Sequence, residues 1–535
     1  MKTHQTQTTA IEEAKHLDQG EPVDDRPNRL RSLNPADTTV VGEVDWTDAE
    51  ESAPLLERAR ETQRAWKRRP LSTRIERGRQ IVHEILEWRR ELLELVVDET
   101  GKSSLEARRE LWEATREARE ILSKAQQRLE SEADGRWWTP GRQSESSWAP
   151  RGTVLVVASS YDPVQTTLGP ALAAIVAGNS VIVVAHEDSP LVVKSLSNIV
   201  EPMGIPDRLW NGVVGGRRLV ADVADGADAI VSYGSPALTR KLARRQGERM
   251  VPVFGRWKTR DAMVVLSDAN IERAARAAVC GCCGGAGRSR RTLRRIYVQQ
   301  SVADPFVDAV VEEVGTLRQS NRGDQEGFEV GPLSDVEQLQ HLEQLVDDAS
   351  RKGARLVAGG RIRPRCRGHY FEPTVLTDVD ESMRLWQEGG PGPVVAIAPV
   401  EAPAEAVGRI RDVDGYGAVS LFTANTEVAR NLAGGLRAPV VGINEVVRDV
   451  PPASPPVRGT IDGPIDPVGA DRLQALSRRI LTVEKRWPGL PSILETRTPE
   501  RMEKALDTAL SAVYRRGWLR KTVDTIVPDA LSRRV

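Results

Sequence analysis

Residues 153–184 read TVLVVASSYDPVQTTLGPALAAIVAGNSVIVV, and this stretch decides the fold class. Two short apolar runs, TVLVV and SVIVV, flank a longer segment typical of a buried helix. The alternation continues through a helix from Pro190 to Met203, strand-like GVVGG and AIVSYGS, a helix through Leu238 and Leu242, then VPVF and AMVVL. Parallel strands need a crossover helix to return the chain between them. The pattern therefore predicts an α/β fold with a Rossmann-type, doubly wound parallel sheet.

Length and charge restrict the class of protein further. A chain of 535 residues is too long for one compact core, so two or more domains are expected. The hydrophobic fraction of 40% fits a globular protein, and a formal net charge of −1 gives no attraction to nucleic acid or to an anionic membrane. The N-terminus lacks the apolar core of a signal peptide and no run is long enough to span a bilayer, which predicts a cytoplasmic location.

The cysteines indicate neither a disulfide framework nor a metal site. Cys280, Cys282 and Cys283 are crowded together, and Cys366 is remote from them. No histidine stands near the cluster and its spacing is not that of a zinc finger, so reduced thiols are expected and no metal is assigned.

Several motifs in consistent order resemble the aldehyde dehydrogenase superfamily. The resemblance covers roughly residues 32–485. The matching segments are Leu168-Gly169-Pro170 with Ala177-Gly178-Asn179, Ser232-Tyr233-Gly234-Ser235, Asp261-Ala262-Met263 with Asp268-Ala269-Asn270, AGRSRRTLRRIYV at 286–298, and Glu372-Pro373-Thr374-Val375-Leu376. The resemblance implies a cofactor domain, a second α/β domain and an oligomerisation hairpin.

The resemblance also implies boundaries for these parts. A hairpin with Trp137, Trp138 and Trp148 is expected to form a subunit interface, the alternative being a surface loop. The C-terminal extension carries a helix face of Leu506, Ala509, Leu510 and Val513. The expected division is a disordered tail (1–29), the dinucleotide-binding domain (30–134 and 151–270), the hairpin (135–150), the catalytic-type domain (271–470), a terminal oligomerisation strand (471–486) and a helical extension (487–535).

Two of the three residues at the family's catalytic positions cannot perform its chemistry, whereas the third, Tyr161, can still donate one hydrogen bond. The family uses a thiolate nucleophile, a carboxylate base and an oxyanion donor. Counting from the flanking motifs places Arg290 at the nucleophile, Arg256 at the base and Tyr161 at the oxyanion asparagine. An arginine side chain stays protonated and offers only donors, so it replaces neither a thiolate nor a base.

The implied cofactor contacts for NAD or NADP are only partly present, which makes cofactor binding doubtful. Val184 replaces the lysine that bonds the adenosine ribose, while Glu187 is retained. The glutamate and phenylalanine of the Glu-x-Phe-Gly-Pro motif are absent from the equivalent residues 389–393. The remaining candidates for a pyrophosphate contact are Gly215, Gly216, Gly234 and Ser235.

Three hypotheses follow from these substitutions. The first is an inactive family member, a pseudoenzyme with a structural or regulatory role, pairing with itself as a dimer or tetramer or with an active relative. The second is an NAD(P)-dependent aldehyde dehydrogenase in which Cys282 or Cys283 serves as a displaced nucleophile. The third is a site for a small anionic ligand between Arg256, Arg288 and Arg290, the alternative being that these arginines pair with acids such as Asp162.

Overall fold

A computed structural model of the chain describes residues 29–133, 142–255, 260–319, 330–363, 367–411, 417–436, 438, 440–447, 469–485, 500, 503 and 507. The chain divides into two units, and the described residues of the first lie within 29–129 and 149–478 and those of the second within 130–148 and 479–507. Across the ranges above, no helix is both long enough and apolar enough to cross a lipid bilayer. The candidate helix face at 506–513 falls outside these ranges.

The predicted parallel sheet is confirmed in the first unit. Its strand order is β7-β6-β5-β8-β9, with every neighbouring pair parallel. The strands are β5 (Thr153–Val157), β6 (Ser180–Ala185), β7 (Trp210–Val214), β8 (Ala229–Ser232) and β9 (Val253–Gly255).

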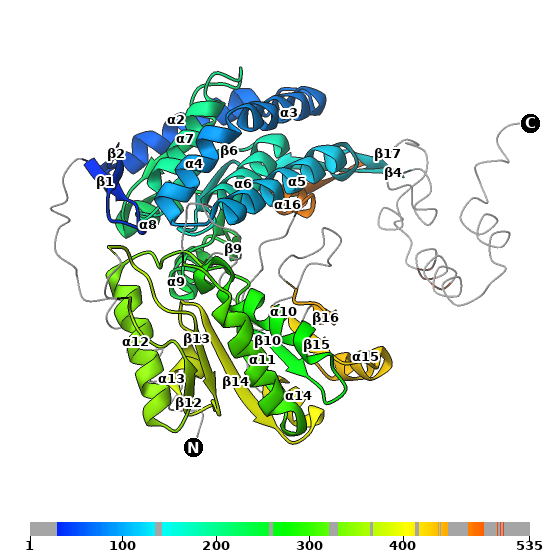
Figure 1. Ribbon diagram of the computed structural model, residues 1–535. Coiled ribbons are helices and arrows are strands. Elements are labelled where there is room, and N and C mark those ends of the chain that lie inside the picture. Colours follow the sequence, from blue (N-terminus) through cyan, green and yellow to red (C-terminus); the bar gives the residue numbers. More distant parts are fainter. Residues whose placement is uncertain are drawn as a thin grey trace, which may run out of the picture. The chain divides into compact units, whose positions relative to one another are not determined.

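Alternating side chains of these strands fill two different cores. Val154, Val156, Val181 and Val183 pack in one core, whereas the intervening Leu155, Val157, Ile182 and Val184 pack in the other. Successive side chains of a strand point to opposite faces of the sheet, so alternate residues enter different cores. Because both faces are covered, every residue of the two runs is apolar. Helix α5 lies along α6 (Figure 1). The helices are α2 (Ser52–Trp66), α3 (Leu71–Glu87), α4 (Arg89–Thr100), α5 (Ser104–Leu129), α6 (Pro163–Ala177), α7 (Pro190–Val200), α8 (Arg217–Gly226), α9 (Pro236–Gly247) and α16 (Asp471–Ala475).

Two large apolar side chains of these helices are exposed. Trp88 is 49% exposed at the junction between α3 and α4. Leu105 is 67% exposed in the first turn of α5. The buried face of α5 instead carries Glu110 and Glu117 among its apolar residues.

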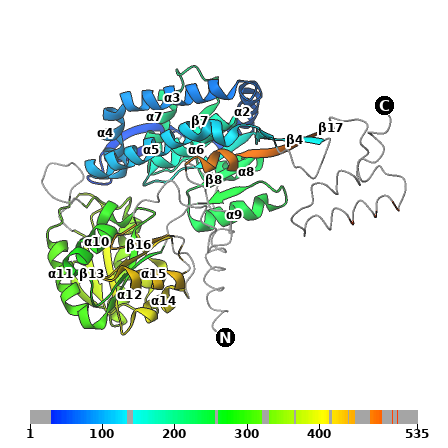
Figure 2. The same cartoon turned by 90° about the vertical axis from the view of Figure 1, so that its right-hand side faces the viewer.

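A second, mixed sheet also belongs to the first unit. Its order is β12-β13-β14-β11-β10-β15-β16, and only β12 runs antiparallel to its neighbour. Helices α14 and α15 pack together, as the turned view of Figure 2 shows. The strands are β10 (Asp261–Val265), β11 (Leu293–Gln299), β12 (Arg355–Ala358), β13 (Thr374–Thr377), β14 (Val394–Val400), β15 (Val419–Phe422) and β16 (Val441–Ile443). The helices are α10 (Ile271–Cys283), α11 (Ala303–Gly315), α12 (Val336–Arg351), α13 (Arg384–Glu388), α14 (Pro403–Arg411) and α15 (Thr426–Gly435).

The smaller elements complete the described chain. Strands β1 (Arg29–Leu33) and β2 (Val40–Asp45) pair antiparallel. Strands β3 (Glu132–Ala133), β4 (Arg142–Pro150) and β17 (Ser477–Lys485) form a three-stranded sheet in the order β17-β4-β3. Three short 3-10 helices are η1 (Ala49–Glu51), η2 (Gly284–Gly287) and η3 (Gln300–Val302). Trp148 is half-buried in β4, and Trp137 and Trp138 fall outside the described residues.

Two motifs behind the resemblance have packing roles. Asn179 accepts a hydrogen bond from the Gly152 N–H at 2.9 Å and donates to the Leu476 carbonyl at 3.0 Å, so it ties β6 to α16. A side chain at Gly169 would lie 2.4 Å from Nη1 of Arg472. The glycine thus leaves room for a buried arginine.

Candidate active site

The backbone of the loop after α10 packs directly against Tyr161 and residues 389–393, which leaves no room for a side chain at two of its positions. Gly285 and Gly287 have left-handed φ angles of 64° and 66°. A Cβ at Gly285 would lie 2.2 Å from the Tyr161 hydroxyl, and one at Gly287 would lie 1.8 Å from the Gly392 carbonyl oxygen. Both positions therefore require glycine for two independent reasons, backbone conformation and space.

Arg290, which the sequence assigns to the nucleophile position, is held by protein groups. Its Nε lies 3.4 Å from Oδ2 of Asp162, and both side chains are largely buried. Its second terminal nitrogen donates to Oε1 of Gln165 at 2.9 Å, and its guanidinium carbon lies 4.9 Å from the centre of the Tyr233 ring. The pairing with Asp162 is the one that the sequence offered as an alternative to an anion site.

Arg288 is directed to other partners. It donates to the Thr100 carbonyl, to the Pro332 carbonyl at 3.3 Å and to the Ser334 hydroxyl at 2.5 Å. Its guanidinium carbon lies 4.8 Å from the centre of the Tyr161 ring. Burial lowers the pKa of Arg288, although neighbouring acidic groups oppose that shift. Arg256, the third arginine of the proposed anion site, lies outside the described residues.

Sequence reasoning missed the lysine at the centre of this network. The Lys102 ammonium lies 2.6 Å from Oε2 of Glu110 and 2.9 Å from Oδ1 of Asp162, and 2% of its side chain is exposed. The second oxygen of Glu110 accepts the N–H groups of Val164 and Gln165, at 2.8 and 3.1 Å, where α6 begins. The only available signal was a lysine beside Gly101 and a glutamate within an apolar helix face, which normally indicates solvated charge.

The charges of Lys102 and Asp162 stabilise each other. Burial opposes the charge of Lys102, but Asp162 and Glu110 outweigh it and raise the pKa of this ammonium. Burial likewise opposes the charge of Asp162, yet Lys102 and Arg290 hold the pKa of that carboxyl below its usual value. Burial raises the pKa of Glu110, partly offset by Lys102.

Tyr161, at the oxyanion position, is engaged as well. Its hydroxyl donates to Oε2 of Glu106 at 3.3 Å, and the other oxygen of Glu106 accepts the Gly285 N–H. The Lys102 ammonium lies 4.1 Å from the centre of its ring. Glu106 is a second residue that sequence reasoning missed.

The two candidate displaced nucleophiles, Cys282 and Cys283, lie in the hydrophobic core beside the mixed sheet. Cys282 and Cys283 are fully buried near the end of α10, among the apolar residues of the mixed sheet. Burial raises the pKa of Cys282 to about 12 and that of Cys283 well above its usual value. A thiolate is the nucleophilic form, so neither cysteine is activated at neutral pH. In the part of the chain that the structure describes, no cluster of His, Cys, Asp or Glu could hold a metal ion; Cys366 lies outside it.

The candidate cofactor residues lie at the ends of parallel strands and helices. Gly216 precedes the first turn of α8, and Ser235 caps α9, its hydroxyl accepting the Leu238 N–H at 3.2 Å. A Cβ at Gly215 would lie 2.3 Å from the Leu219 side chain, and one at Gly234 would lie 2.8 Å from that of Leu238. These glycines therefore also serve local packing. Glu187 is half-buried beyond β6, whereas Val184 is fully buried and offers no donor.

Residues 389–393 are anchored by an arginine of β11. Arg294 donates to the Gly390 carbonyl at 2.6 Å and to the Gly287 carbonyl at 2.5 Å. Burial lowers the pKa of Arg294 to about 10. Arg294 thus joins the loop at the nucleophile position to the segment that replaces Glu-x-Phe-Gly-Pro.

Comparison with known proteins identifies the family. The model of the aldehyde dehydrogenase family matches residues 23–460. A Mycobacterium ulcerans protein named "Putative succinate-semialdehyde dehydrogenase (NADP(+)) 2" is 30% identical, over 79% of this chain and 82% of its own length. A Vibrio 3,6-anhydro-alpha-L-galactose dehydrogenase is 28% identical, over 77% of this chain and 86% of its own.

Solved structures share the fold. A Staphylococcus aureus betaine aldehyde dehydrogenase in complex with NAD+ superposes with a TM-score of 0.81 at 24% identity, covering 88% of this chain and 94% of that one. A Mycobacterium tuberculosis aldehyde dehydrogenase complexed with NAD+ gives 0.80 at 22% identity, covering 86% and 95%. The chain belongs to the aldehyde dehydrogenase family.

Proposed function

We propose that this chain is a catalytically silent aldehyde dehydrogenase homologue with a structural or regulatory role. The observation that carries the proposal is the buried pairing of Arg290 with Asp162 at the nucleophile position. A family reaction forms a hemithioacetal on a thiolate there, whereas a guanidinium supplies no electron pair. The two nearby thiols, Cys282 and Cys283, are buried with raised pKa values, which disfavours the displaced-nucleophile alternative.

NAD or NADP is the cofactor class to consider, since relatives and structural neighbours are named with these nucleotides. The residues present fit such a cofactor only in part. Glu187 still offers a carboxylate at the end of β6, but Val184 offers no ribose donor and the Ser235 hydroxyl is already used as a helix cap. At the nicotinamide end, residues 389–393 contain neither carboxylate nor aromatic ring. We therefore assign no hydride step to this chain.

An activity assay tests the proposal directly. Purified protein with a panel of aldehydes, including succinic semialdehyde, and either NAD or NADP is expected to form no reduced cofactor above a heat-treated sample. The M. ulcerans relative serves as the positive control. Isothermal titration with both nucleotides then separates a silent homologue that retains its cofactor from one that has lost it. Turnover that is abolished by Cys282→Ser or Cys283→Ser would instead support the displaced nucleophile.

We also propose that the chain pairs with itself or with an active relative through strand β17. The support is an exposed apolar edge: Ile480, Leu481 and Val483 are 47%, 57% and 55% exposed, and β17 is the outer strand of its sheet. Exposed apolar strand edges invite pairing with another chain.

Light scattering coupled to size exclusion checks this pairing. Wild-type protein is expected to elute as an oligomer, and Leu481→Lys with Val483→Lys is expected to shift it to a smaller species. Leu356→Lys is the matched control, because Leu356 is an apolar residue 42% exposed on another edge strand, β12. A monomeric wild type, or an equal response in both variants, contradicts pairing through β17.

A further inference from the structure

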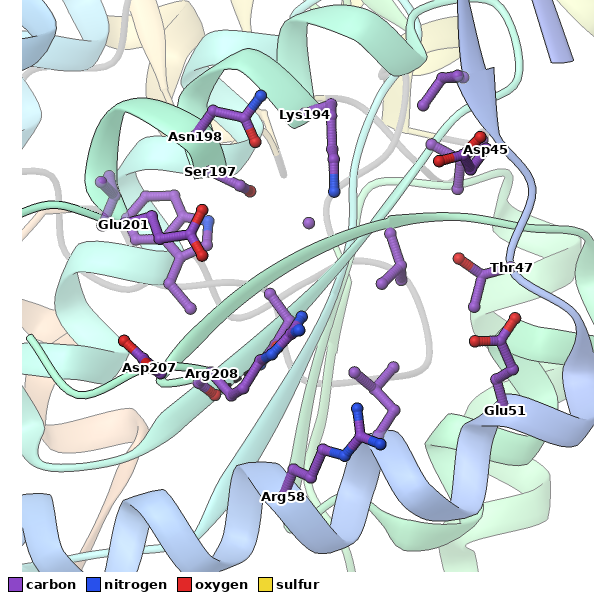
Figure 3. A pocket seen from close by; sticks show the side chains of 18 of the residues that line it. Asp45, Thr47, Glu51, Arg58, Lys194, Ser197, Asn198, Glu201, Asp207 and Arg208 are labelled. Carbon is purple, nitrogen blue, oxygen red and sulfur yellow. Dashed lines mark hydrogen bonds between the residues drawn. The ribbon is translucent and has the colours of Figure 1, made fainter. Parts of the chain in front are cut away.

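A polar pocket of about 260 Å³ lies at the outer edge of β7, apart from the residues described above (Figure 3). Its walls come from α2, from α7, from residues 44–51 and from the loop at 205–208. The pocket forms because β7 is the outermost strand of the parallel sheet. The segment after β2 covers only its far end, where the Thr47 N–H donates to the Val214 carbonyl at 2.7 Å.

The N–H and C=O groups of alternate residues of β7 point towards this pocket. The Val214 carbonyl points outward, and alternate residues of a strand face the same way, so the N–H and C=O groups of Trp210 and Gly212 also point outward. A Cβ at Gly212 would lie 2.1 Å from the Ser197 hydroxyl, which explains the glycine at this position.

Three cationic side chains converge on the space. Figure 3 shows Lys194 entering from α7 and Arg58 from α2 on the opposite side, with Arg208 directed between them. Within the described part of the chain, none of the three forms an ion pair. Arg208 adopts a left-handed φ of 66°, a conformation that costs free energy in a non-glycine residue.

The acidic residues of the pocket lie around these cations and are partly engaged. Asp45 pairs with Arg29 at 3.2 Å, and Glu51 accepts the Asp48 N–H at 3.3 Å in the capping box of η1. Glu201 faces the space from the other side (Figure 3). The three cations Arg58, Lys194 and Arg208 therefore stand among carboxylates, and those of Glu201 and Asp207 can accept hydrogen bonds from hydroxyls.

A buried donor beside the pocket also lacks a partner. Trp210 lines the pocket and is 7% exposed, and its indole Nε1 has no hydrogen-bond acceptor among the described residues. Buried tryptophan N–H groups usually find one.

We propose that this pocket binds a small phosphorylated sugar, either free or as part of a nucleoside monophosphate. The phosphate would lie between Arg58, Lys194 and Arg208, since guanidinium groups bind phosphate oxygens with paired, charge-assisted hydrogen bonds. The sugar hydroxyls would donate to the surrounding carboxylates, including Glu201. The site does not depend on the proposed silent function, because it shares no residue with the nucleophile region.

Isothermal titration of the full-length protein tests the proposal, with ribose 5-phosphate, AMP, inorganic phosphate and unphosphorylated ribose as probes. Ribose 5-phosphate or AMP is expected to bind, and Arg58→Met and Lys194→Met are each expected to weaken binding by about tenfold or more. Arg64→Met is the matched control, since Arg64 is an exposed arginine on the same helix that does not line the pocket. Unchanged melting temperatures establish that the variants fold.

Three outcomes overturn the proposal. The first is no binding of either phosphorylated probe. The second is equal affinity for inorganic phosphate, because the carboxylates would then contribute nothing to recognition. The third is an equal loss in Arg64→Met, which would indicate a general charge effect. Comparing ribose 5-phosphate with AMP distinguishes the two sources of the phosphorylated sugar.

Discussion

Replacement of Lys102 by methionine is expected to lower the free energy of unfolding by about 3–5 kcal/mol. Lys102 is 2% exposed and lies within 2.9 Å of two carboxylates, those of Glu110 and Asp162. Methionine preserves the apolar length of the side chain but removes the ammonium, so both carboxylates lose a buried positive partner. Urea titration followed by tryptophan fluorescence measures the loss.

Two further variants separate the buried charge from general damage. Lys124→Met removes a lysine from an ion pair of the same type, 2.9 Å from Glu120, but this lysine is 42% exposed. Its expected cost is about 0.3–0.5 kcal/mol. Adding Glu110→Gln to Lys102→Met should restore part of the stability, because the amide oxygen can still accept the N–H groups that start α6. Equal losses in Lys102→Met and Lys124→Met contradict the central role of Lys102.

The expected loss of stability in Lys102→Met bears on function, because Asp162, the partner of Lys102, also pairs with Arg290. Asp162 contacts both Lys102, at 2.9 Å, and Arg290, at 3.4 Å. The region where the family reacts is thus a neutralised ion network in this chain, with Lys102 and Arg290 facing Asp162 and Glu110.

The sequence predicted the parallel sheet, and it assigned Arg290 to the nucleophile position, because both inferences depend on local order. Apolar runs that alternate with helices allow few topologies, and the strand that follows Arg290 fixes its register. The partners of Arg290 were harder to predict from the sequence. Asp162 was anticipated as one such acid, but Lys102 is 60 positions away from it and was not. Nothing in the local pattern distinguishes a buried ion pair from a solvated one.

The same limitation explains the other differences. Glu110 and Glu117 lie on the buried face of α5, where a periodicity of apolar residues predicts only hydrophobic contacts. Trp88 is exposed because the backbone breaks between α3 and α4, and no glycine or proline marks that break. The pocket beside β7 combines side chains from segments about 150 residues apart, Arg58 and Arg208 among them, so only the folded chain brings them together.

Arg472→Met is expected to cost a similar amount, about 3–5 kcal/mol. Arg472 of α16 lies 2.9 Å from Oε1 of Glu117 and donates to the Tyr233 hydroxyl at 2.7 Å, and both charged side chains are nearly inaccessible to solvent. These bonds join the end of the first unit to α5 and to the residue after β8. Without the arginine, Glu117 still accepts the hydrogen bond from the Gly469 N–H at 2.9 Å but loses its countercharge.

The matched control is Arg128, whose partner Asp471 is the residue next to Arg472. Arg128→Met breaks the pair with Asp471, which also joins α5 to α16 at 2.9 Å but is more than a third exposed on both sides, and its expected cost is below about 1 kcal/mol. Gly169→Ala should reproduce much of the larger effect, since the new methyl would lie 2.4 Å from Arg472 and 2.9 Å from Glu117. If Arg472→Met and Arg128→Met prove equally mild, burial does not govern this contact, and the glycine of the Leu168-Gly169-Pro170 motif needs another explanation. If only the buried pair is costly, the motif is retained in this chain for the arginine that it accommodates, and its presence implies nothing about catalysis.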